Sequence, residues 1–259
     1  YIFVVLSTFE ASRACLHHPL HQSHLGGYVA RACFTITVLL PASMVVLMRL
    51  RSELFDELYA VGRLLPILIL MCGISLFAIL LPVVFQARED ITQVERKVLE
   101  RMIVTLLLGL GGGSLVSIAC ADDAASVFLW LVSMVAVNDS AAYLVGAKIE
   151  TPPLSPVVSP KKTVLGSFAG LVGGVLTGLA LSFLVPKIEN WSLYVSGVFC
   201  ISLLAQLGDL LKSLVKRLHG MKDMGTLLPG HGGVLDRIDG LLLASPVAIA
   251  LLLIIRGGG

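Results

Sequence analysis

Residues 164–186 read VLGSFAGLVGGVLTGLALSFLVP and contain no charged side chain. A helix needs about 20 apolar residues to cross the hydrocarbon core of a bilayer, and this stretch is long enough. Gly166, Gly170, Gly174 and Gly178 recur every four residues. On a helix they form one smooth stripe, which allows a neighbouring helix to approach closely. The stretch therefore predicts a membrane-spanning helix that packs against another helix.

The composition of the whole chain agrees with a membrane protein. Of its 259 residues, 56% are hydrophobic and 14% are charged, whereas soluble domains have about 25% charged residues. The mean hydropathy is +0.92. These values exclude a soluble enzyme, a disordered chain and a coiled coil. The net charge of +2 is small, so we expect no nucleic-acid partner. The five cysteines form no C-x-x-C pair, which argues against a zinc site or a disulfide framework.

Further apolar segments predict an all-α, polytopic membrane helix bundle with about seven to nine transmembrane helices. Residues 1–9 are a candidate for an additional, truncated or interfacial segment, and the first residue, Tyr1, leads us to expect that sequence precedes it. We divide the chain into an N-terminal hydrophobic multi-span region, 1–100, and a C-terminal membrane-embedded catalytic region, 101–259. The expected spans are 32–48, 64–86, 101–120, 125–147, 164–186, 192–210 and 240–255.

Three long polar stretches, 87–100, 148–163 and 211–239, fall on one side of the membrane if each span crosses once. Of the 19 Lys and Arg residues, 14 lie on that side and only Arg49, Arg51, Arg63, Lys187 and Arg256 lie on the other. Positive charge collects on the cytoplasmic side. We therefore expect a multi-pass protein of a bacterial inner membrane, with its active site facing the cytoplasm.

Charged residues gather in the stretch 208–239, GDLLKSLVKRLHGMKDMGTLLPGHGGVLDRID. Asp209, Lys212, Ser213 and Lys216 have the spacing of one helix face, and so do Asp236 and Asp239. Two helix ends that face each other with carboxylates provide the oxygen ligands that Mg²⁺ prefers. The lysines and arginines of the stretch would hold phosphates. The glycines around His231 would allow the backbone to approach a ligand. Together these features indicate a nucleotide or polyphosphate site.

Two other clusters interrupt apolar sequence. Ser159-Pro160-Lys161-Lys162-Thr163 is expected to open a helix, whose first N–H groups favour phosphate. Asn138-Asp139-Ser140 lies inside an apolar span, where Asp139 shares a helix face with Tyr143. An ionisable residue inside a membrane span indicates a functional site.

At these residues the chain resembles the phosphatidate cytidylyltransferases, also called CDP-diacylglycerol synthases. The resemblance is carried by the pattern S-x-x-K-R-x₄-K-D-x-G-x₃-P-G-H-G-G-x-x-D-R-x-D, from Ser213 to Asp239, and by the two clusters above in the same order. It is strong over residues 138–240. The chain departs from the family pattern at Leu165, where an acidic residue is usual, and at Gly240, where serine is common.

The resemblance implies that CTP and phosphatidate, drawn from the lipid bilayer, react to give CDP-diacylglycerol and pyrophosphate with Mg²⁺ as cofactor. A second metal ion and a homodimer are left open. A CTP-dependent lipid kinase and a multi-span transporter are the alternative functions. The predicted metal ligands are Asp209 and Asp236, then Asp239 and Asp139. The predicted catalytic residues are Asp209, Ser213, Lys216, Arg217, Lys222, Asp236 and Arg237. The predicted substrate-binding residues are Asn138, Asp139, Tyr143, Ser159, Lys161, Lys162, Thr163, His231, Gly232 and Gly233.

Overall fold

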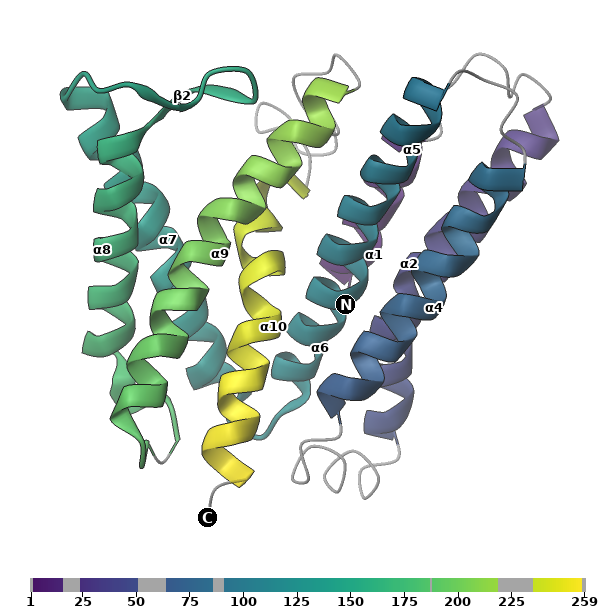
Figure 1. Cartoon of the computed structure of the whole chain (residues 1–259). Coiled ribbons are helices and arrows are strands. Elements are labelled where there is room, and N and C mark those ends of the chain that lie inside the picture. Colours follow the sequence, from purple (N-terminus) through teal and green to yellow (C-terminus); the bar gives the residue numbers. More distant parts are fainter. Residues whose placement is uncertain are drawn as a thin grey trace.

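The computed structural model describes residues 2–15, 24–50, 64–85, 91–186, 188–218 and 235–257. These parts of the chain are almost entirely helical, and most helices run between the two ends of one bundle (Figure 1). The first half contributes α1 (Ile2–Cys15), α2 (His24–Leu50), α4 (Leu64–Phe85), α5 (Ile91–Val104), the π-helix η2 (Thr105–Gly111) and α6 (Gly112–Cys120). The second half contributes α7 (Ala124–Lys148), strands β1 (Pro153–Ser155) and β2 (Ser159–Thr163), α8 (Val164–Ala180), the short 3-10 helix η3 (Ser182–Leu184), α9 (Trp191–Leu218) and α10 (Leu235–Gly257).

The protein is an integral membrane protein with a helical fold, as predicted. Among the described residues, four helices are long and apolar enough to cross a membrane: Val98–Cys120, Ala124–Lys148, Trp191–Leu218 and Leu235–Ile255. This number is lower than the seven to nine expected. Three further apolar helices, Val38–Leu47, Pro66–Leu76 and Val164–Ala180, are shorter. The predicted span 164–186 is one of these, because α8 ends at Ala180 and the chain continues into η3. The predicted region boundary at residue 100 falls inside α5.

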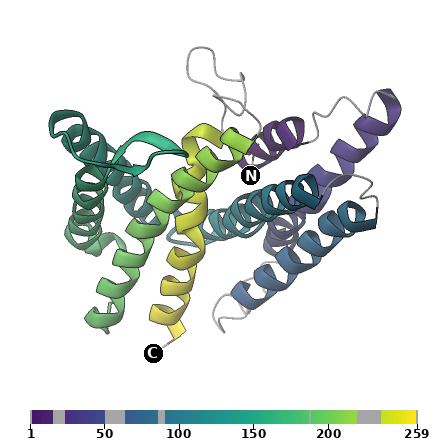
Figure 2. The same ribbon diagram turned by 45° about the horizontal axis from the view of Figure 1, so that its top comes forward.

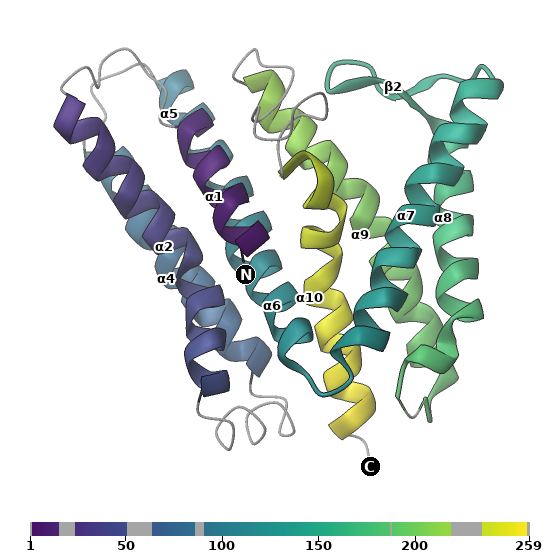
Figure 3. The ribbon, with the colours of Figure 1, turned by 180° about the vertical axis from the view of Figure 1, so that it is seen from behind.

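The polar stretches that were expected on one side do border the same end of the bundle. The C-terminus of α7, the N-terminus of α8, the C-terminus of α9 and the N-terminus of α10 all lie at the upper end in Figure 1. The N-terminus of α5 lies there as well, and the view from behind shows the same order (Figure 3). The chain thus brings its charged helix ends together at one end of an apolar bundle.

The glycine stripe packs as predicted. Gly166, Gly170, Gly174 and Gly178 are the buried residues of α8, and α8 packs most extensively on α7. A Cβ at Gly166 would lie 2.7 Å from the carbonyl oxygen of Ala142 on α7. Only helices without side chains at this crossing can approach so closely.

Glycine also permits the contact between α9 and α10. A Cβ at Gly208 would lie 2.5 Å from the carbonyl oxygen of Asp239, and one at Gly240 would lie 3.2 Å from the carbonyl oxygen of Ala205. The two backbones therefore cross at the position where each helix carries an aspartate, Asp209 on α9 and Asp239 on α10. The predicted span 192–210 ended too early and the predicted span 240–255 began too late, since α9 continues to Leu218 and α10 begins at Leu235.

A small β-hairpin departs from the all-α prediction. Strands β1 and β2 pair antiparallel, with Pro153 opposite Thr163 and Ser155 opposite Ser159. Four prolines between residues 152 and 160 prevent a helix in this stretch. Lys161 and Lys162 therefore lie on a strand, not in the first turn of a helix. The hairpin crosses the upper end of the bundle beside α8 and α9 (Figure 2).

Candidate active site

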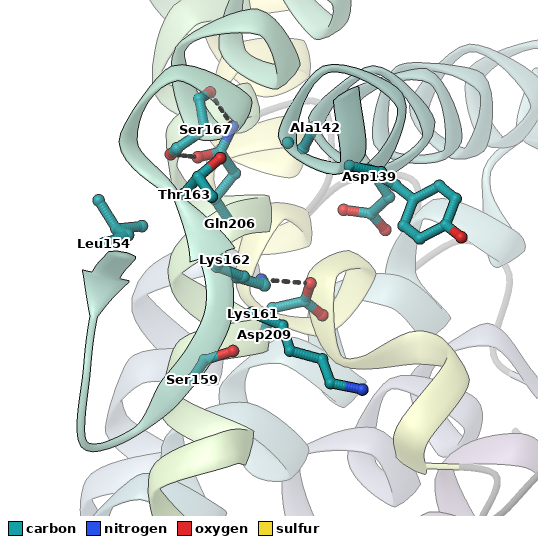
Figure 4. A pocket seen from close by; sticks show the side chains of 13 residues that line it. Asp139, Ala142, Leu154, Ser159, Lys161, Lys162, Thr163, Ser167, Gln206 and Asp209 are labelled. Carbon is teal, nitrogen blue, oxygen red and sulfur yellow. Dashed lines mark hydrogen bonds and ion pairs between the residues drawn. The ribbon is translucent and has the colours of Figure 1, made fainter. Parts of the chain in front are cut away.

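A cavity of about 530 Å³ lies between α7, the hairpin, α8 and α9. Its volume is within the range of small-molecule sites, about 300–1,000 Å³. Figure 4 shows acidic and basic side chains from different elements that converge on it. Its wall is formed by Asp139, Ala142, Tyr143, Gly146, Ala147, Leu154, Ser159, Lys161, Lys162, Thr163, Ser167, Gln206 and Asp209.

The hairpin supplies the basic wall of the cavity. Lys162 on β2 extends toward α9, where its Nζ lies 2.7 Å from Oδ2 of Asp209 (Figure 4). Lys161, the residue before it, lines the same cavity, and its side chain has no ion pair or hydrogen bond with any described residue. Thr163 ends the strand and caps α8, because its Oγ1 accepts a hydrogen bond of 3.1 Å from the N–H of Gly166. The two lysines are therefore presented by a fixed strand-to-helix junction.

The acidic wall comes from α7 and α9. The carboxylate of Asp139 points into the cavity, toward the pair formed by Asp209 and Lys162 (Figure 4). Within the described parts of the chain, Asp139 has no ion pair or hydrogen bond. Tyr143 follows one turn later on the same face of α7 and also lines the cavity, as its spacing predicted. The polar face that Asp139 and Tyr143 form on the apolar helix α7 therefore lines the cavity.

Behind Asp209 lies a buried charge cluster between α9 and α10. Nζ of Lys212 is 3.8 Å from Oδ1 of Asp209 and 3.9 Å from Oδ1 of Asp236. It also contacts Oδ2 of Asp239. Lys216 pairs with Asp236 at 3.1 Å. The two helix ends face each other, as expected from the sequence, but an ammonium group lies among their carboxylates.

Three other predicted site residues have interactions with the protein itself. Ser213 donates a hydrogen bond of 2.8 Å to the carbonyl oxygen of Asp209. Nε of Arg217 donates one of 3.3 Å to the carbonyl oxygen of Val158, which ties the end of α9 to the hairpin turn. Arg237 lies on α10 with an exposed side chain.

Asn138 does not line the cavity. Its side chain is fully buried and donates hydrogen bonds of 2.7 and 2.9 Å to the carbonyl oxygen and the hydroxyl of Ser202. It also accepts one of 2.7 Å from Nε2 of Gln206. We correct its predicted substrate-binding role to one in helix packing, because an amide satisfied on both sides inside the bundle has no group left to reach a substrate.

The sequence comparisons identify the family. The cytidylyltransferase family is matched over residues 21–255, which is most of the chain. The chain belongs to the cytidylyltransferase family. The predicted resemblance is therefore confirmed.

Curated relatives of this chain are named phosphatidate cytidylyltransferase. The protein of Brucella suis is 42% identical over 120 residues, which cover 46% of this chain and 44% of the relative. That of Staphylococcus haemolyticus is 35% identical over 144 residues, with coverage of 56% and 55%. That of Staphylococcus aureus is 38% identical over 125 residues, with 48% of each chain covered. The chain spans about half the length of the curated relatives it matches.

Of the four predicted metal ligands of this chain, two lie together at the cavity. The described residues contain no group of three or more His, Cys, Asp or Glu side chains arranged to hold a metal ion. Asp236 and Asp239 contact Lys212 and do not line the cavity, whereas Asp139 and Asp209 both line it. Mg²⁺ commonly binds one or two carboxylates and completes its shell with water and phosphate oxygens. Asp139 and Asp209 fit that requirement.

Two polar residues of the cavity wall were not predicted. Gln206 and Ser167 lie on facing helices, and the Ser167 hydroxyl donates to Oε1 of Gln206. Nε2 of Gln206 donates to the carbonyl oxygen of Ser167 at 2.8 Å. Gln206 precedes Asp209 by three residues, so the helix-face spacing that grouped the charged residues would also have found it. Four predicted site residues lie outside the described residues: Lys222, His231, Gly232 and Gly233.

Proposed function

We propose that this chain transfers the cytidylyl group of CTP to phosphatidate, giving CDP-diacylglycerol and pyrophosphate in phospholipid synthesis. The observation that carries the proposal is one cavity that combines two lysines with two carboxylates inside an integral membrane protein. The family match and the names of the relatives support the same reaction.

The reaction requires an oxygen of the phosphatidate phosphate to attack the α-phosphorus of CTP. A new P–O bond forms there, the bond to the β-phosphate oxygen breaks, and pyrophosphate leaves with the bonding electrons. A phosphate anion is already a nucleophile, so the protein need not remove a proton. Its main contributions are positioning and charge neutralisation at the phosphates.

Lys161 and Lys162 are suited to hold those phosphates. Lys161 has no protein partner among the described residues, so its ammonium group is available for an anion in the cavity. Lys162 is oriented by its 2.7 Å pair with Asp209, which keeps its charge beside the carboxylates. Both side chains line the same cavity, so both ammonium groups can reach phosphates bound there.

Asp139 and Asp209 would hold the Mg²⁺ ion. When bound, the ion would neutralise charge on the triphosphate and on the departing pyrophosphate. The two carboxylates come from different helices, and the Asn138–Ser202–Gln206 hydrogen bonds fix these helices against each other directly below the cavity. Each carboxylate is thus presented from a rigid support.

The placement in the membrane belongs to the same proposal. Most Lys and Arg residues belong to the side that carries the hairpin, which supports a cytoplasmic cavity mouth in a bacterial inner membrane. Phosphatidate would bring its headgroup to this level while its acyl chains stay in the bilayer. The homodimer stays a prediction, to be tested by the mass of the particle in detergent.

The proposal is tested with the purified protein in phosphatidate-containing nanodiscs. CTP labelled at the α-phosphate should give a labelled lipid, whereas CTP labelled at the γ-phosphate should give labelled pyrophosphate and no labelled lipid. Asp209→Asn is the inactive control. If the lipid is labelled by γ-labelled CTP, the protein is a lipid kinase and the proposal is wrong. If neither labelled CTP gives a labelled lipid, a CTP-dependent transferase is refuted.

A further inference from the structure

Lys212 is the most enclosed cation among the described residues that surround the site. Its exposed fraction is 9%, and it lies inside a helix that is long and apolar enough to cross a membrane. Its Nζ lies within 4 Å of carboxylate oxygens from Asp209, Asp236 and Asp239. The same nitrogen donates a hydrogen bond of 3.3 Å to the backbone carbonyl of Asp236. One ammonium group therefore contacts every carboxylate of the α9–α10 crossing.

The backbone explains why so many charges meet here. Gly208 and Gly240 allow α9 and α10 to cross without intervening side chains, so Asp209 and Asp239, each adjacent to one of these glycines, are brought close together. Like charges at such distances repel strongly in a medium of low dielectric constant. A buried charge that loses its partner is a large destabilisation, larger than the benefit of forming the pair.

The charges in this cluster balance. Lys162 pairs with Asp209 and Lys216 pairs with Asp236, and each of these lysines reaches a single carboxylate of the three. Lys212 is the partner of Asp239 and also bridges to the other two. Lys212 does not line the cavity, so it can act on a substrate only through Asp209.

We propose that Lys212 is a positioning residue: its ammonium group is the internal counter-ion that holds the carboxylate of Asp209 in the cavity wall. The ammonium group of Lys212 attracts the carboxylate of Asp209 and also offsets the negative charges of Asp236 and Asp239. The structural part of this inference needs no substrate. The kinetic part rests on the proposed transferase function.

The structural part is tested by unfolding in detergent, without nucleotide or metal. Lys212→Met keeps the length of the side chain and removes its charge, so the unfolding temperature should fall. Adding Asp239→Asn restores the charge balance and should recover most of that fall. The matched control combines Lys212→Met with Asp122→Asn, which removes the same charge at the other end of the bundle. The side chain of Asp122 is 92% exposed to solvent. This control should recover nothing.

Two results would overturn the counter-ion role. In one, Lys212→Met unfolds at the wild-type temperature. In the other, Asp122→Asn restores stability as well as Asp239→Asn does, because the effect would then reflect total charge and not the cluster.

The kinetic part uses the doubly substituted protein, Lys212→Met with Asp239→Asn, once it is shown to be folded. If Lys212 positions Asp209, kcat should fall about tenfold or more, because a small displacement of a reacting group is costly. The KM for CTP should stay within about twofold, since Lys161 and Lys162 are retained. Asp239→Asn alone leaves Lys212 beside Asp209 and should keep more of kcat than the double variant.

The possible outcomes separate the two proposals. Wild-type kcat in the folded double variant, or an equal loss in Asp239→Asn alone, would overturn the positioning role while leaving the transferase function intact. A wild-type protein that forms no lipid product from α-labelled CTP would refute the transferase function and the kinetic role together, but the unfolding measurements would still decide the counter-ion role.

Discussion

Replacing Gly170 with alanine tests how α7 and α8 are held together below the cavity. A Cβ at this position would lie 2.6 Å from Oδ1 of Asn138, 2.7 Å from its carbonyl oxygen and 2.9 Å from Cβ of Ala142. Real Cβ contacts are essentially never this short, so the helices must move apart or Asn138 must turn. Asn138 is not free to turn, because it is hydrogen-bonded to Ser202 and Gln206.

The cost follows from these distances. Adding a methyl group to a well-packed interior costs about 1–3 kcal/mol, and a broken buried hydrogen bond adds about 1–3 kcal/mol. We expect Gly170→Ala to lower the free energy of unfolding by about 2–4 kcal/mol, after allowing for partial relaxation. At about 2–4 °C per kcal/mol for a chain of this size, the unfolding temperature should fall by roughly 4–16 °C.

The measurement is thermal unfolding in detergent micelles, followed by circular dichroism. Gly73→Ala is the matched control, because a Cβ at Gly73 on α4 would have nothing within 4 Å. Alanine there should be neutral or slightly stabilising, since it favours the helix. If Gly170→Ala unfolds at the same temperature as Gly73→Ala, the close packing of α8 on α7 is wrong.

Three further predictions concern the site. Asp209→Asn and Asp139→Asn should each lower turnover of CTP at least about a hundredfold while the protein stays folded, and a near-normal rate at ordinary Mg²⁺ concentration would exclude that residue as a metal ligand. Lys162→Met should raise the KM for CTP about tenfold or more, measured by initial rates, because a charge-assisted contact to phosphate is lost; an unchanged KM would place the phosphates elsewhere. In a background without native cysteines, Val157→Cys in the exposed hairpin turn should react with an impermeant thiol reagent only after cells are opened, whereas Glu189→Cys at the other end should react in intact cells; the reverse pattern would invert the topology.

The parts of the fold that follow from local patterns were predictable. Length and hydropathy located α7 as 125–147 against an observed 124–148, and the four-residue glycine repeat identified the packed face of α8. Helix ends were harder, because hydropathy falls where charges begin but helices do not stop there. Asp209 and Asp236 are therefore on helices, although both lie at or beyond the ends of the predicted spans.

The site could be predicted by residue type and less well by arrangement. Spacing placed Asp209, Lys212 and Lys216 on one face of a helix, and the structure has them on one face of α9 toward α10. Spacing within a helix cannot say which carboxylate of one helix meets which lysine of another. That depends on the crossing of α9 and α10, which is set by Gly208 and Gly240. The hairpin that brings Lys162 to Asp209 was missed for the same reason, since strand pairing joins residues that no helical period relates.

The balance of charge explains why the cavity, and not the buried cluster, is the place for a ligand. Among the described residues, Asp236 pairs with Lys216 and Asp239 with Lys212, so these two carboxylates need no added ion, whereas Asp209 also faces the cavity. Asp139 and Lys161 have no such partner within the same residues, and both line the cavity. They leave one negative and one positive charge uncompensated in a space of about 530 Å³. A nucleoside triphosphate that carries a divalent cation supplies both missing charges at once, because its metal can bind a carboxylate while its phosphate oxygens bind an ammonium group. A phosphate without a metal would satisfy only Lys161 and would be repelled by Asp139. We therefore propose that the cavity favours the metal-bound form of the nucleotide over the free one.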